Sequence, residues 1–172
     1  DELGTSYTFF GSSHRTTISY EQLKMDYGLP GSPEGHIDGV NLKMDKYSQK
    51  LNHHRDISFL TFQTFDLDQR FINYNHSEYV TGSDFASVSM GQNLFSLQGK
   101  LVGEQLTLGS LFQYRDFRAG GFYWTPDTEE IRVSLFGLFQ KNINKTTLQL
   151  SSRIEHLSCL LYTSPSPRDR YI

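Results

Sequence analysis

The strand-like segments of this chain are joined by connections that alternate strictly between short and long. This alternation is the sequence feature that constrains the fold most. Strands are predicted over residues 3–9, 15–25, 40–51, 57–74, 85–101, 106–117, 129–140 and 146–156. Short turns are expected at residues 10–14, 52–56, 102–105 and 141–145, and long polar loops at residues 26–39, 75–84 and 118–127. A soluble sandwich has no reason to sort its connections in this way. An up-and-down membrane barrel has short turns on one rim and long loops on the other.

The first long loop is the densest cluster of chain-bending residues. Residues 26–39 hold four of the fourteen glycines and two of the five prolines in the sequence. Such a composition predicts a loop and not the interior of a helix or strand.

Side chains alternate between apolar and polar in the later strands, as in a half-buried sheet. In residues 106–117 one face carries Leu106, Leu108, Phe112 and Tyr114, and the other carries Thr107, Gln113 and Arg115. Residues 129–140 and 146–156 follow the same rule, although Phe136 and Leu138 interrupt a polar face. In residues 40–51 the apolar positions change to lysine and serine part-way along. A long strand that leaves the hydrocarbon and enters water would explain this change.

Composition supports a sheet with a wet face. Hydrophobic residues make up 37% of the chain and aromatic residues 14%. No apolar run approaches the roughly 18 residues of a membrane-spanning helix, which leaves a membrane β-barrel open. The net charge of −3, with both signs interspersed, gives no footprint for nucleic acid. The single cysteine excludes an internal disulfide and a cysteine-based metal site.

The two ends of the chain predict a piece of a longer protein. The sequence begins at Asp1 without an initiating methionine. Residues 159–172 depart from the strand pattern and are rich in serine, proline and arginine, so they are expected to be a non-native, adapter-derived or disordered tail. Residues 1–158 are then the structured part.

Three stretches, in this order, resemble the barrel of the TonB-dependent outer-membrane receptors. The first is Tyr27-Gly28-Leu29-Pro30-Gly31 with the loop that follows it to Val40. The second is residues 73–79, and the third runs from Gln113 through an aromatic-rich loop to Thr128. The resemblance covers roughly residues 3–158 and lacks the TonB box, the plug domain and the terminal aromatic strand of the family.

The resemblance implies an all-β, antiparallel, up-and-down transmembrane β-barrel of which this chain is a part, with about eight of some 22 strands. It implies a place in the outer membrane of a Gram-negative bacterium, in contact with its lipid. The whole receptor would import a scarce small-molecule or metal-chelate ligand, such as a siderophore, haem, zinc or a cofactor, with energy from the TonB complex. No resident cofactor and no nucleic-acid partner are expected.

The candidate binding residues lie on the predicted long loops. Glu34, His36 and Asp38 form the best ligand cluster, because imidazole with carboxylates suits zinc or a related divalent ion. His76 with Glu78 on the next loop could complete the site, so His36 and His76 are the predicted metal ligands. The alternative is a solvated loop whose polar groups hydrogen-bond the turns.

Two further clusters have competing interpretations. Tyr123 and Trp124 are predicted to contact the ligand, whereas Phe117 fits an interfacial aromatic girdle. His53 and His54 are interpreted as part of a solvated turn, because adjacent residues of an extended chain point to opposite faces.

No enzyme site is predicted, because the glycines do not frame a phosphate loop or a nucleophile elbow. Two other functions stay open. One is a complete eight-stranded outer-membrane barrel with a structural or adhesive role, which is an allowed size. The other is a soluble β-sandwich that binds carbohydrate through Trp124 and nearby tyrosines.

Overall fold

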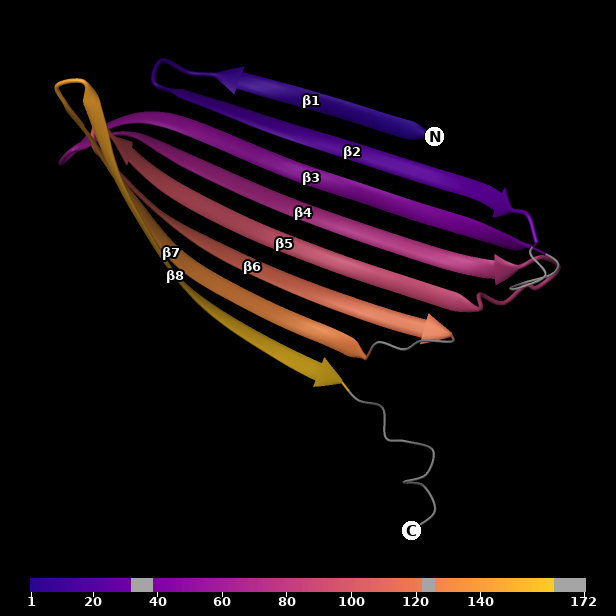
Figure 1. Ribbon diagram of the computed structural model, residues 1–172. Helices are drawn as coiled ribbons and strands as arrows, with labels where there is room; N and C mark the ends of the chain where they lie inside the picture. The colour runs from indigo at the N-terminus through magenta and orange to yellow at the C-terminus, as the bar shows by residue number, and fades with distance from the viewer. Residues whose placement is uncertain (32–38, 122–125, 163–172) are drawn as a thin grey trace, which may run out of the picture.

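The chain forms one antiparallel sheet of eight strands that follow each other in sequence order (Figure 1). The computed structural model describes residues 1–31, 39–121 and 126–162. The strands are β1 (Glu2–Phe10), β2 (His14–Leu29), β3 (Val40–Phe59), β4 (Phe62–Val80), β5 (Val88–Gly103), β6 (Leu106–Gly121), β7 (Asp127–Ile143) and β8 (Thr146–Tyr162). None of these residues belongs to a helix that is long and apolar enough to cross a membrane.

The predicted alternation of connections is confirmed. The turns fall at residues 11–13, 60–61, 104–105 and 144–145, and the longer connections join Leu29 to Val40, Val80 to Val88 and Gly121 to Asp127. All turns gather at one end of the sheet, named here the turn end, and all loops at the other, the loop end (Figure 1). The all-β, up-and-down topology expected from the sequence is therefore the observed one.

The predicted turn at residues 52–56 is wrong. These residues lie inside β3, and the reversal comes later, at Leu60 and Thr61, where Leu60 has a φ of +53°. The polar side chains that suggested a turn instead bond to the neighbouring strand. Asn52 Nδ2 donates to Asp68 Oδ1 at 2.5 Å, and His54 Nδ1 lies 2.6 Å from Asp66 Oδ1. A polar run in a sheet with one wet face does not by itself end a strand.

The strands also extend further toward the loop end than predicted. Residues 75–80, expected in a loop, belong to β4, and β2 continues to Leu29. β8 continues to Tyr162 and pairs there with Asp127, so the strand runs past the expected boundary at residue 158. Backbone pairing with the adjacent strand holds these segments extended, which their composition alone does not reveal.

The sheet curves and stays open. β1 and β8 lie at its two edges, and every ladder joins strands consecutive in sequence (Figure 1). Residues 1–31, 39–121 and 126–162 contain no second sheet, so these residues do not form a two-layer sandwich. The same residues do not close β1 onto β8 into a complete small barrel.

One face of the curved sheet is more crowded than the other. Leu42, Ser48, Ile72, Glu130 and Ser134 are buried, and the cross-strand register places all five on the same face. Curvature brings side chains together on the inside of a bend, so this face is named the concave face, and its opposite the convex face.

Apolar side chains change face part-way along the strands. In the turn-end half most apolar residues lie on the convex face, whereas Leu111, Phe136 and Leu138 lie on the concave face. The convex residues include Ile18, Leu67, Leu97, Leu108, Phe112, Val133, Leu135, Leu150 and Ile154. In the loop-end half of β2 to β6 they lie on the concave face, among them Met25, Leu42, Met44, Val80, Val88, Met90 and Phe117. The irregular pattern noted in residues 40–51 is this exchange of faces.

Phe136, which interrupts the polar face of β7, covers a glycine on β6. Gly109 and Phe136 are directly paired, and a Cβ on Gly109 would lie 2.3 Å from the Phe136 ring and 2.9 Å from the Gly99 carbonyl oxygen. An aromatic ring over a cross-strand glycine fixes the register of the two strands. The aromatic residue is therefore a packing feature of the concave face.

We expect Gly109→Ala to lower the free energy of unfolding by about 1–3 kcal/mol, because the added methyl group displaces the Phe136 ring. Chemical denaturation measures this effect. Gly99→Ala is the matched control, since its Cβ would lie 3.8 Å from the nearest atom, which is ordinary contact. Equal stability of the two variants would contradict the packing role of Gly109.

Candidate functional site

The turn-end half of the concave face is a polar groove. A cavity of about 510 Å³ is lined there by residues including Arg15, Asn52, His54, Asp66 and Lys100. His54 Nδ1 lies 2.6 Å from Asp66 Oδ1, and Lys100 Nζ lies 3.9 Å from Asp66 Oδ2. Charges of both signs alternate across neighbouring strands, so this half of the face is suited to contact with water and polar groups.

An ion-pair network continues this polar surface across β6, β7 and β8. Glu130 is the buried centre, with Oε2 2.8 Å from Arg115 Nη2 and Oε1 3.2 Å from Arg132 Nη2. Arg132 also reaches Glu155, which in turn pairs with Arg153. Glu130 holds two guanidinium groups together on one face and neutralises part of their charge.

The loop-end half of the concave face contains His76 in a mostly apolar setting. Its Nε2 lies 3.0 Å from Glu78 Oε1, and the Tyr74 ring stacks on its ring with centroids 6.4 Å apart. Its Nδ1 is buried and, among the residues that the structure describes, has no hydrogen-bond partner. A buried ring nitrogen without a partner is rare and calls for an explanation.

The register surrounds His76 with methionines. Met44 on β3 and Met90 on β5 are its direct cross-strand neighbours, and Met25 on β2 is opposite Met44. These are all the methionines of the chain. Their common row follows from strand register, which no local sequence pattern specifies, so the sequence alone does not reveal it.

The structure describes only two of the seven predicted site residues, His76 and Glu78. Glu34, His36, Asp38, Tyr123 and Trp124 lie outside the described residues. His76 and Glu78 are brought together, but on β4 and not on a loop as predicted. The strand position aims both side chains at the concave face and fixes their distance.

His53 and His54 do not form a solvated turn. His53 lies on the convex face, where its Nδ1 is 2.8 Å from Thr16 Oγ1, and His54 lies on the concave face against Asp66. The prediction that adjacent histidines point to opposite faces is confirmed by the register.

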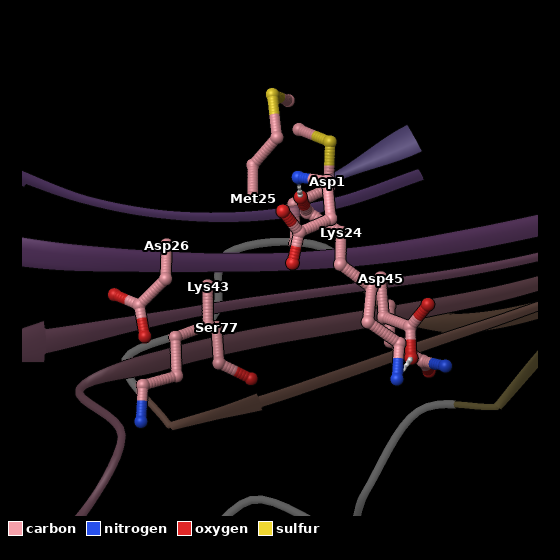
Figure 2. A pocket seen from close by; sticks show the side chains of 9 residues that line it. Asp1, Lys24, Met25, Asp26, Lys43, Asp45 and Ser77 are labelled. Atoms are coloured by element: carbon pink, nitrogen blue, oxygen red, sulfur yellow. Dashed lines mark hydrogen bonds and ion pairs between the residues drawn. The ribbon is translucent and has the colours of Figure 1, made fainter. Parts of the chain in front are cut away.

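The convex face at the loop end is ionic. A groove of about 500 Å³ is lined there by residues that include Lys24, Asp26, Lys43 and Asp45, which Figure 2 shows pointing to the side of the sheet opposite Met25. Further along the same face, Arg118 lies 2.8 Å from Asp116 and 3.5 Å from Glu129. The hydrogen bond to Asp116 raises the pKa of the Arg118 guanidinium above its ordinary value. The charged side chains make this half of the convex face suited to contact with water.

No group of three or more histidine, cysteine, aspartate or glutamate side chains within the described ranges is placed to hold a metal ion. Comparison of the chain with protein-family models, with curated proteins and with solved structures finds no match. The class that the structure itself defines is an open, curved, eight-stranded antiparallel meander.

We expect Glu130→Leu to destabilise the fold by about 1–3 kcal/mol, because it leaves Arg115 and Arg132 together without their shared carboxylate. The value lies below that of a fully buried pair, since both arginine side chains are about a third or more exposed. Denaturant unfolding measures it. Glu129→Gln, on the convex face, should change the stability by less than about 0.5 kcal/mol. A loss no greater in Glu130→Leu than in this control would show that the network is not structural.

Proposed function

We propose that this chain is part of the transmembrane β-barrel of a TonB-dependent outer-membrane receptor, with its turn end toward the periplasm and its loop end outside the cell. The observation that carries the proposal is the exchange of apolar side chains between the faces. Lipid would cover the apolar turn-end half of the convex face, while the ionic loop-end half would stand in water.

The height of the convex apolar band fits a bilayer. On β6 it runs from Leu106 to Tyr114, which is roughly 26 Å of strand at ~3.3 Å per residue. A tilt of ~40° reduces this to about 20 Å, and the side chains at each end extend it toward the ~25 Å apolar band of outer-membrane barrels. Leu135, Leu150 and Ile154 in this band are 61%, 59% and 75% exposed. A contiguous apolar surface of this kind marks a site of contact with lipid or protein.

Aromatic rings line the boundary between the two halves. Tyr20, Phe71, Phe95 and Tyr114 share one cross-strand row on the convex face, and Tyr47 packs on Phe71 with ring centroids 5.9 Å apart. The next row toward the loop end contains Asn73, Asn93, Asp116 and Glu129. Aromatic girdles lie at such a boundary between hydrocarbon and water. The predicted girdle residue Phe117 lies on the other, concave face.

Further strands of a larger barrel would complete the sheet at both edges. Unpaired strand edges cannot stand in hydrocarbon, so β1 and β8 would each pair with a further strand of a larger barrel. The polar turn-end half of the concave face would then line the lumen, as the interior of large barrels is polar. Transport of a scarce ligand and energy from the TonB complex come from the family resemblance.

We expect Leu135→Arg to destabilise the protein by about 2–4 kcal/mol in lipid vesicles, because it places a charge on the lipid face near mid-bilayer. Leu111→Arg is the matched control at nearly the same height, on the concave face opposite Ser134. It should cost much less, since the lumen is wet. Urea titration of vesicle-folded protein measures both. Equal losses in the two variants, or a chain that folds in water without lipid or detergent, would overturn the membrane assignment.

The receptor class is tested by reading the gene on both sides of this segment. A signal peptide, a TonB box and a plug of about a hundred residues upstream would establish it. A signal peptide joined directly to residue 1, with a stop soon after β8, would overturn it and favour a small barrel with a structural or adhesive role.

A further inference from the structure

We propose that Met44, His76 and Met90, with Met25 beside them, form a binding site for a soft monovalent metal ion, Cu(I), on the concave face near the loop end. Side-chain chemistry and strand register support the site, which does not rest on the proposed function.

The register places the four side chains in one row. Met25 pairs with Met44, Met44 pairs with His76, and His76 pairs with Met90, so four adjacent strands each contribute one side chain to the same face. Directly opposite residues on one face have Cβ atoms about 4.5–5.5 Å apart. The methionine side chain is unbranched, with three rotatable bonds. Two thioether sulfurs can therefore reach an ion held at the imidazole between them.

Glu78 orients the histidine. With its carboxylate 3.0 Å from Nε2, the favoured tautomer donates from Nε2–H to Glu78 and leaves a lone pair on Nδ1. That nitrogen is buried and unpartnered among the described residues. Metal-binding histidines commonly donate their other ring N–H to a carboxylate in this way. The imidazole is thus held ready to accept a metal ion at Nδ1.

The donor set selects the ion. Thioether sulfur is a soft ligand that favours Cu(I), whereas carboxylates and carbonyls favour hard cations. Zinc is bound by thiolate, imidazole and carboxylate, and thioethers are not among its usual ligands. The thioethers of Met44 and Met90 and the neutral imidazole carry no charge, so a monovalent cation costs less to desolvate here than a divalent one.

Apolar packing alone explains the row of methionines beside His76 less well than metal binding does. Val80 and Val88 also lie on the loop-end half of the concave face, so aliphatic side chains are available for packing there. All three methionines of the chain nevertheless stand in the one row that contains His76. Figure 2 shows the Met25 side chain projecting from the face opposite Asp26 and Lys43.

The test is Cu(I) affinity of the full chain in detergent, measured by competition with a chromophoric Cu(I) chelator. Every protein carries Cys159→Ser and no histidine tag, because the exposed Cys159 thiol would itself bind Cu(I). We expect one Cu(I) per chain. Glu78→Gln removes a hydrogen-bond partner of the ligand His76, so it should weaken Cu(I) binding about tenfold. Loss of a ligand itself should weaken Cu(I) binding by more than this, in each of the variants Met44→Leu, Met90→Leu and His76→Gln. X-ray absorption of the bound copper should show sulfur neighbours.

Met→Leu exchanges conserve volume, so they should leave folding intact, which far-UV circular dichroism checks. His53→Gln is the matched control, because this histidine lies on the convex face, and it should leave Cu(I) affinity unchanged. A folded chain that binds no Cu(I), or Cu(I) affinity insensitive to Met44→Leu and Met90→Leu, would overturn the site. Zn(II) binding as tight as Cu(I) and independent of the methionines would also overturn it. These results do not depend on the vesicle experiment, so the two proposals can fail separately.

Discussion

A sheet of one layer has no interior, and this constraint governs the rest of the structure. Among the described residues, only Leu42, Phe62 and Ile72 are buried hydrophobic side chains. The hydrophobic burial that stabilises an ordinary domain of this size is absent. Continuous backbone hydrogen-bond ladders hold neighbouring strands together. The side chains of each face must then be covered by solvent or by another molecule, because the sheet has no second layer. The polarity of the side chains on the two faces therefore indicates what surrounds this protein.

The chemistry of the two faces changes part-way along the strands. Under the proposed function, the apolar convex face would meet hydrocarbon and the polar concave face behind it would meet water. Beyond the aromatic row of Phe71, Phe95 and Tyr114 the order reverses, with charged groups outside and apolar groups inside. Because side chains alternate with a period of two, the reversal needs only a change in which alternate positions are apolar. The concave loop-end half is then a sheltered apolar surface, where the proposed soft-ion site would combine the methionine thioethers with the one ring nitrogen of His76, Nδ1, that has no partner among the described residues.

The sequence specified much of the topology and little of the site. Alternating short and long connections predicted the meander, because turn chemistry at residues such as Asn144 is local. The polar segments at 52–56 and 75–80 were assigned to connections, because polarity was taken as a sign of exposed loop. In a sheet with one wet face Asn52 and His54 bond across to Asp68 and Asp66, and residues 75–80 pair with β3 and β5.

The sequence by itself determined the strand class, the order of turns and loops, and the period of two, all of which depend on residues close together in the chain. Only the tertiary structure decided which residues face each other. Met44 and Met90 are far apart in sequence, yet each is paired with His76, and Gly109 is covered by Phe136. Register is a relation between strands, and a shift of one residue would move every side chain to the opposite face. A site built across four strands is for that reason visible only after the strands are aligned.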